Sequence, residues 1–256
     1  KYGEIWGYKV DGLFRNDKEA AEYASRIDLS TVASGYYTAT GAYGKGVRGG
    51  DIKYLDLNGD NIVNGGKGTL DDPGDRRVIG NSSPRYQYGA SLNFSWYGFD
   101  VSVFMQGIGR LDWYPGADNL RFWGPYCRPY ATFVPKNFMS QVWSEENPDA
   151  YFPRARAYTS LNSNSGTAYY TNDRYLQNLA YCRLKNLTIG YTIPRRLTSK
   201  VGIKECRIYF SGENLATWSA LKSDFLDPEQ AAADSDKKAN VYPWCKTYSI
   251  GLNLTF

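Results

Sequence analysis

Histidine is absent from this chain, and several other features of catalytic or metal-binding proteins are scarce. Histidine supplies most acid–base catalysis and many transition-metal sites, so its absence argues against both. The four cysteines, Cys127, Cys182, Cys206 and Cys245, form no CxxC pair, which argues against a zinc site. We find neither a nucleophile elbow nor paired carboxylates in a convincing context. The chain is therefore predicted not to be an enzyme.

Long apolar runs and basic clusters are also missing. No stretch approaches the roughly 18 consecutive apolar residues of a transmembrane helix. The net charge is +4 over 256 residues, and lysine and arginine are scattered, which argues against nucleic-acid binding. No signal peptide is present, and Lys1 falls in the middle of a patterned stretch. We therefore expect either that the N-terminus has been removed or that the chain is part of a longer protein.

Aromatic residues, in contrast, are abundant. They make up 16% of the chain, with 23 tyrosines and 7 tryptophans. Both side chains combine an apolar body with a polar tip, so they suit membrane–water interfaces and also sugar-binding surfaces.

The end of the chain alternates between apolar and small or polar residues. Its apolar positions are Tyr248, Ile250, Leu252, Leu254 and Phe256. A period of two predicts a strand with one apolar and one polar face. Such a strand fits a transmembrane β-barrel, with lipid outside and a polar lumen inside, and it also fits the last strand of a soluble β-sandwich.

A β-hairpin is predicted over residues 86–105. Alternating segments flank Tyr97-Gly98, a plausible two-residue turn. That turn would place Trp96 opposite Phe99, and all apolar positions would then share one face. The apolar face is predicted to include Leu92, Phe94, Val101, Val103, Ile189, Leu252 and Leu254, and the polar face Gln87, Asn93, Ser102, Thr188 and Asn253. Phe104 is the one large apolar residue on the polar face.

Two further strands are predicted at about 179–193 and 207–217, and a weaker one at 5–14, which brings the total to about six. Short turns join some strands, whereas residues 15–85, 108–178 and 218–245 form very long connections. Bacterial outer-membrane barrels show this alternation of short periplasmic turns and long extracellular loops. A compact soluble domain seldom carries such long loops.

Several motifs resemble a known family. They are residues 50–60 (GDIKYLDLNGD) with 78–81 (VIGN), 143–150 (WSEENPDA) with Pro153-Arg154, 181–191 (YCRLKNLTIGY) with Pro194, 211–215 (SGENL), 227–229 (DPE) and the terminal strand. In this order they resemble the C-terminal part of SusC/RagA-like TonB-dependent outer-membrane transporters of Bacteroidetes. The family's plug domain, TonB-contacting segment and most barrel strands have no counterpart here.

The resemblance implies an all-β fold: residues 1–256 would be the C-terminal part, about six strands, of a 22-stranded antiparallel transmembrane β-barrel with long extracellular loops. It implies TonB-driven import of oligosaccharides or peptides through the bacterial outer membrane. The implied partners are the rest of the barrel and plug, a SusD-like surface lipoprotein, the TonB complex, and lipid with lipopolysaccharide. A siderophore-type receptor and a secreted carbohydrate-binding β-sandwich are the alternatives.

One loop has the oxygen spacing of a calcium site. Asp56, Asn58, Asp60, the Ile62 carbonyl and Asn64 occupy positions 1, 3, 5, 7 and 9 of an EF-hand-type loop. Position 12 is Lys67 instead of glutamate, although Asp71, Asp72 or Asp75 could substitute. The loop is predicted either to bind Ca²⁺ or to use these side chains in Asx turns.

Aromatic residues crowd one long connection, and others flank the predicted strands. Trp113, Tyr114, Phe122, Trp123, Tyr126 and Tyr130 are expected either to form a small core within the loop or to contact a partner or substrate. Tyr86, Trp96, Tyr191 and Tyr248 are predicted interface girdles. The terminal alternation Tyr248, Ile250, Leu252, Leu254 and Phe256 is predicted to direct membrane insertion. Cys127 and Cys245 could form a disulfide.

Overall fold

The computed structural model describes residues 2–38, 46–127, 134, 136–156, 161, 166–222, 226–233 and 244–256. The chain divides into two compact units. Lys1–Ser83 and Asp112–Gln177 belong to the first, whereas Pro84–Leu111, Asn178–Ala233 and Val241–Phe256 form the second.

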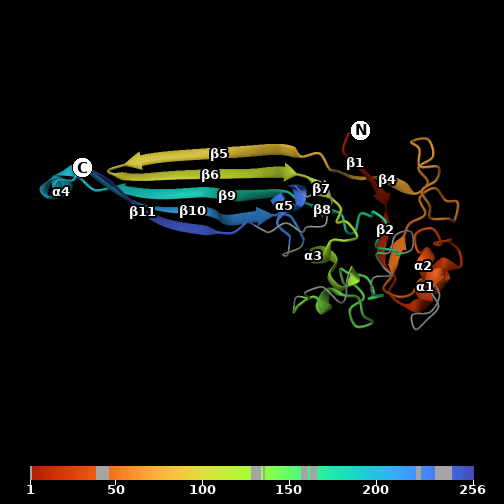
Figure 1. The fold of residues 1–256 in the computed structure, drawn as a ribbon. Coiled ribbons are helices and arrows are strands. Elements are labelled where there is room, and N and C mark those ends of the chain that lie inside the picture. Colours follow the sequence, from red (N-terminus) through yellow and green to blue (C-terminus); the bar gives the residue numbers. More distant parts are fainter. Residues whose placement is uncertain are drawn as a thin grey trace. The chain divides into compact units, whose positions relative to one another are not determined.

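The second unit is built on a five-stranded antiparallel sheet (Figure 1). Its strands lie in the order β11-β10-β9-β6-β5. Their bounds are β5 (Arg85–Trp96), β6 (Phe99–Arg110), β9 (Tyr181–Thr192), β10 (Glu205–Ser219) and β11 (Thr247–Thr255). The predicted antiparallel β fold is confirmed, and within the described residues the sheet does not close on itself, as expected for part of a barrel.

The predicted hairpin is present in the predicted register. Trp96 lies opposite Phe99, Phe94 opposite Val101 and Leu92 opposite Val103. The two turn residues, Tyr97 and Gly98, have φ angles of 46° and 87°. Positive φ at both central positions is what a type I′ turn requires, and this turn matches the twist of the flanking strands.

The next strands of this sheet continue the antiparallel order. β9 connects to β10 through a short helix, α4 (Arg195–Thr198), and a 3₁₀ turn, η4 (Ser199–Val201). The terminal strand β11 pairs with β10, with Leu252 opposite Ile208, as predicted. The two short connections and the C-terminus lie at one end of the sheet, and the long connections leave from the other (Figure 1).

The first unit contains short elements. They are β1 (Glu4–Tyr8), β2 (Val10–Leu13), α1 (Asp17–Ala24), α2 (Ser34–Thr38), β3 (Ile52–Tyr54), β4 (Arg76–Asn81), β7 (Asp112–Trp113), α3 (Leu120–Trp123), η1 (Gly124–Tyr126) and η2 (Met139–Gln141); β8 (Gln177–Asn178) begins at its boundary. Strands pair as β1–β4, β2–β3 and β7–β8. Helix α1 begins after Asn16, whose side chain accepts the Glu19 N–H at 2.9 Å. The core includes the fully buried Phe14, Ile52 and Tyr54.

The weak strand predicted over residues 5–14 does not join the five-stranded sheet. It is split into β1 and β2, which pair with β4 and β3 of the first unit. Its backbone groups are committed there: the Tyr8 N–H donates to the Thr171 carbonyl and the Phe14 N–H to the Asp51 carbonyl. Gly12, with φ 89°, lies within β2, where the pairing with β3 is irregular. The large sheet therefore has five of the six predicted strands.

Candidate functional site: the two faces of the five-stranded sheet

One face of the sheet is apolar across all five strands. Residues directly opposite each other in a sheet share a face. The register therefore groups Leu92, Phe94, Val101, Val103, Leu187, Ile189, Ile208, Phe210, Ile250, Leu252 and Leu254. Leu92 is 64% exposed, Ile250 83% and Leu252 56%. A continuous exposed apolar face of this kind is what a lipid-facing wall requires.

Aromatic side chains lie at both ends of this apolar face. Trp96 and Tyr191 are at the end of the short connections, and Tyr86 and Tyr248 are at the opposite end. Phe256, at the chain end, is 73% exposed. Their positions agree with the predicted girdles, and their roles in membrane contact and insertion stay predictions.

The opposite face is polar and carries a cross-strand ion pair. Arg207 of β10 donates to both carboxylate oxygens of Asp100 on β6, and its Nε lies 2.9 Å from Asp100 Oδ1. The pair spans β9 at Gly190, where a Cβ atom would lie 2.5 Å from the guanidinium. Only glycine leaves room for Arg207 to cross the intervening strand. The predicted polar-face residues share this side, and Asn253, for example, lies opposite Arg207.

A β-bulge in β9 changes which side chains reach this polar face. The pairing of β9 with β6 passes over Lys185. Unbroken alternation from Leu187 would put Arg183 on the apolar face, but the extra residue returns Arg183 to the polar face, opposite Gln106. The facing part of β10 is irregular too, and Asn214 there has φ 53°.

Arg183 holds a helix of the β10–β11 connection, α5 (Pro228–Ala233), against the sheet. Its guanidinium donates to Asp227, to Glu229 at 2.8 Å and to the Thr217 hydroxyl at 2.9 Å. The Arg183 side chain is only 2% exposed. Sequence reasoning used Arg183 and residues 227–229 only as family motifs. Asp-Pro-Glu is nevertheless a helix-start signal, because aspartate caps and proline fits the first turn.

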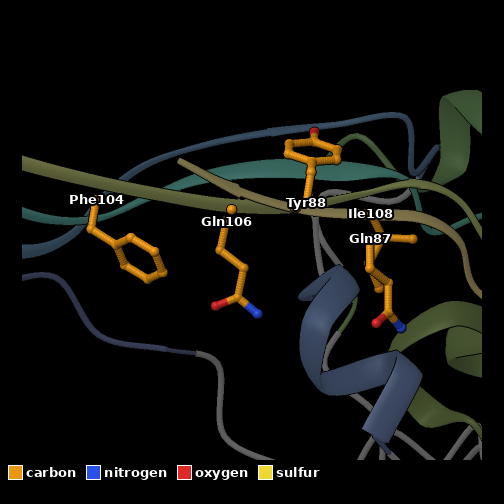
Figure 2. A pocket seen from close by; sticks show the side chains of 7 residues that line it. Gln87, Tyr88, Phe104, Gln106 and Ile108 are labelled. Carbon is orange, nitrogen blue, oxygen red and sulfur yellow. The ribbon is translucent and has the colours of Figure 1, made fainter. Parts of the chain in front are cut away.

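A shallow depression of about 500 Å³ lies on the β5–β6 pair. Its lining is uncharged and consists of Gln87, Tyr88, Gly89, Phe104, Gln106, Gly107 and Ile108. Phe104, Gln106 and Gln87 project to the same side, whereas Tyr88 projects to the other side (Figure 2). Within the described part of the chain, neither glutamine side chain has a hydrogen-bond partner. The depression therefore combines two unused amides with an aromatic ring.

The aromatic residues of the 108–178 connection are buried in the first unit. Trp113, Tyr114, Trp123 and Tyr126 are between 0% and 7% exposed. Around them pack aromatic rings that the sequence did not single out, namely Phe138, Tyr151, Phe152 and Tyr175. Because the rings are covered, the structure supports the interpretation of a core within the loop over direct contact with substrate or partner. Tyr130 lies outside the described residues.

Tyrosine hydroxyls in this core are tied to backbone carbonyls. Tyr54 donates to the Thr167 carbonyl, and Tyr114 donates to the Tyr170 carbonyl at 3.1 Å. The Asn172 amide donates to the Tyr114 hydroxyl at 3.0 Å. Burial raises the pKa of Tyr54 and of Tyr114 well above the ordinary value, so both remain protonated donors.

A buried ion pair that the sequence did not reveal joins distant parts of the first unit. Arg156 donates to both oxygens of Asp51, at 2.9 and 2.6 Å, and its side chain is 3% exposed. Its guanidinium also lies 4.2 Å from the centre of the Tyr36 ring. Burial raises the pKa of Asp51 to about 6, although the Arg156 charge opposes the shift. The two residues are 105 positions apart, so no local pattern pairs them.

The loop with calcium-like spacing is held by its own side chains. The Asp56 carboxylate accepts the N–H groups of Gly59 and Asn61 at 2.7 and 2.9 Å. Asn58 Oδ1 accepts the Asp60 N–H at 3.0 Å, and Asp60 Oδ1 accepts the Ile62 N–H at 2.8 Å. These are the bonds of Asx turns, which account for the residue types at these positions.

Of the remaining acidic candidates, only Asp75 bonds to that loop in the described part of the chain. Asp75 is buried and accepts the N–H groups of Leu57 and Asn64 at 2.7 and 2.9 Å, so it fixes the backbone at both ends of the loop. Asp72 lies 4.0 Å from Lys67, and Asp71 has no bond to the loop among those the structure describes. In the described ranges, no three His, Cys, Asp or Glu side chains converge as metal ligands would.

None of the four cysteines, all of which are described, forms a disulfide. Cys127 and Cys245 belong to different units, and the bridge between them stays a prediction.

No helix in the described part of the chain is both long enough and apolar enough to cross a membrane.

Comparison with known proteins identifies relatives of this chain. It is 28% identical over 215 residues to TonB-dependent receptor P26 of Formosa agariphila, a match covering 81% of this chain and 20% of that protein. It is 27% identical over 217 residues to TonB-dependent receptor P3 of the same organism, covering 81% and 19%. The chain thus spans about a fifth of the length of these relatives. No protein-family model matches it.

Solved structures share its fold. The RagAB peptide importer in the open-open state aligns with 99% of this chain and 22% of its own, at a TM-score of 0.56 and 18% identity. A second RagAB peptide transporter structure aligns with a TM-score of 0.56 and 19% identity, again over 99% of this chain and over 23% of its own. From both sequence and fold, the chain is a relative of the TonB-dependent receptors and is similar to the C-terminal part of a SusC/RagA-like transporter.

Proposed function

We propose that this chain forms part of the wall of a TonB-driven importer in the bacterial outer membrane, within a longer protein. The observation that carries the proposal is the five-stranded sheet with one continuous exposed apolar face and one polar face. The related TonB-dependent receptors are outer-membrane proteins. In the closed barrel the apolar face meets lipid and lipopolysaccharide, and the polar face lines the lumen.

The orientation follows from the two ends of the sheet. The long connections belong on the extracellular side, and the short connections and the C-terminus belong on the periplasmic side, as in bacterial barrels generally. The remaining strands, the plug and the segment that meets the TonB complex are supplied by parts of the protein outside this chain. Open sheet edges are not tolerated in lipid, so β5 and β11 each need a neighbouring strand.

The cargo we propose is an oligosaccharide or a peptide, delivered with a SusD-like surface lipoprotein. The solved neighbours are peptide importers by name. The depression supports a neutral cargo, because Gln87 and Gln106 offer both donors and acceptors beside the Phe104 ring. Amides of this kind match hydroxyl groups and peptide bonds equally well, so the depression does not separate the two classes.

A secreted β-sandwich does not fit the structure. Such a fold would bury the apolar face under a second sheet, yet Phe94 and Leu252 are each 56% exposed.

The test is uptake by cells that produce the parent protein. Labelled neutral oligosaccharides, peptides and ferric siderophores are supplied in parallel, with and without a functional TonB complex. We expect TonB-dependent uptake of an oligosaccharide or a peptide, reduced by Phe104→Ala but not by Ser102→Ala on the same strand and face. Uptake of the siderophores alone would favour the siderophore-type receptor, and TonB-independent uptake would refute the proposal.

A narrower proposal concerns the loop of residues 56–64, which we propose binds Ca²⁺ through Asp56, Asn58, Asp60 and the Ile62 carbonyl. Its support is the 1-3-5-7 spacing of hard oxygen ligands. Calcium titration of the purified parent protein, compared with an Asp56→Asn, Asp60→Asn variant, tests it. Absence of calcium-dependent heat release in the wild type would leave these side chains to the turns they already support.

A further inference from the structure

A short segment of the β10–β11 connection is folded back onto the polar face of the sheet. It runs from Leu226 through α5, and Leu226 and Ala231 are 7% and 2% exposed. Asp227 caps this helix, because its Oδ1 accepts the N–H groups of Glu229 and Gln230 at 3.0 and 3.2 Å. We name residues 226–233 the inward segment.

Charged side chains of β9 bind the inward segment. Arg183 binds Asp227 and Glu229, and Lys185 lies 2.8 Å from both carboxylate oxygens of Glu229. Lys185 also lies 4.9 Å from the centre of the Trp244 ring. Trp244 precedes β11. Arg183 and Lys185, two positions apart on β9, therefore contact the same connection both at α5 and just before β11.

The β-bulge in β9 makes this attachment possible. The bulge at Lys185 is what brings Arg183 to the polar face. A guanidinium that is nearly excluded from water yet bound on three sides is a strong and specific anchor. The ion pair of Asp100 with Arg207 on the same face joins β6 to β10. Arg183 and Lys185 thus differ from Arg207, because their carboxylate partners lie in the inward segment.

The inward segment lies where cargo would pass. Gln106, in the wall of the depression, is directly opposite Arg183. A helix with its side chains is about 10 Å across, so α5 takes up that much of the space above β9 and β10. If the polar face lines the lumen, the inward segment narrows it beside the depression.

We propose that the inward segment sets the upper size limit of the cargo, and that Arg183 is the positioning residue that keeps it in place. This inference rests on the proposed transport function. A charge-based attachment suits such a role, because water solvates both charged partners when they separate.

The test measures TonB-dependent uptake of a graded length series of the cargo by the full parent protein. Asp227→Asn with Glu229→Gln removes the charges that Arg183 and Lys185 bind. Each lost hydrogen bond to a charged group raises the population of the released segment roughly tenfold or more. We expect uptake of the longest members to rise relative to the shortest, whereas Asp100→Asn with Arg207→Gln, the matched control, leaves the ratio unchanged.

A second variant guards against misfolding of the first. Replacing residues 226–233 by a glycine–serine linker of equal length removes the segment without leaving its carboxylates behind, and it should relax the size limit at least as far. The amount of inserted protein is measured for every variant. An unchanged length profile in either inserted variant overturns the size-limit proposal. Absence of uptake by the wild type would instead refute the transport function itself.

Discussion

A lysine on the apolar face should destabilise the inserted protein far more than a lysine on the polar face of the same strand. Leu252 and Ser249 both lie in β11, which runs from Thr247 to Thr255, and each is within two residues of its middle. Leu252 shares its face with Ile208, and Ser249 lies opposite Ser211 on the other face. The two sites therefore differ in the face they occupy more than in their depth.

The expected magnitude follows from that position. A lysine on the lipid face near the midplane of a barrel costs about 2–4 kcal/mol. This corresponds to roughly a 30-fold to 1,000-fold loss in the folding equilibrium. Ser249→Lys should cost little, because the polar lumen leaves the ammonium group hydrated.

Urea titration of the parent protein folded into liposomes measures both changes, with the heat-dependent gel mobility of folded barrels as the readout. The wild type supplies the reference midpoint, and Leu252→Ala shows how much of the Leu252→Lys effect is lost packing. Equal costs for Leu252→Lys and Ser249→Lys would refute the assignment of the two faces. A cost for Ser249→Lys alone would mean that the faces are reversed.

Three further outcomes are expected. Arg156→Leu should lower the stability of the first unit by about 3 kcal/mol, because it leaves Asp51 unpaired and buried. The first unit should then be digested faster by a protease, and unchanged digestion would contradict the buried pair. Gly190→Ala should lower the urea midpoint, since its methyl would lie 2.5 Å from a guanidinium, whereas Gly89→Ala, with its nearest atom at 3.6 Å, should not. Deleting Phe256 should reduce the amount of inserted protein more than uptake per inserted molecule, and normal insertion with lost uptake would contradict its insertion role.

The strands of the large sheet could be predicted because their information is local. Alternation between Leu92 and Trp96 and again between Phe99 and Val103 sets the faces, and Tyr97-Gly98 sets the register. A register slip by one residue would reverse both faces, so only one pairing agrees with the pattern. The same reasoning paired the terminal strand with β10.

The first unit could not be predicted in the same way, because its contacts join residues far apart in sequence. Asp51 and Arg156 are separated by 105 positions, and Tyr54 and Asn172 by 118. The alternation of residues 5–14 was visible, but pairing with β3 and β4 depends on partners that no local rule selects. Aromatic residues such as Trp123 likewise suit a core and a contact surface equally well until their neighbours are known.

The bulge in β9 shows where local alternation stops being sufficient even inside a regular sheet. Periodicity alone gives Arg183 the same face as Leu187, and a charge on that face would meet lipid. An arginine cannot give up its proton there, so strict alternation would leave a charge in lipid. Only a shift of the alternation by one residue avoids this. The passed-over residue, Lys185, provides that change and at the same time supplies a second cation for Glu229. A charged residue that alternation places on the lipid face of a barrel strand therefore predicts a β-bulge beside it. The bulge returns the charged side chain to the polar face.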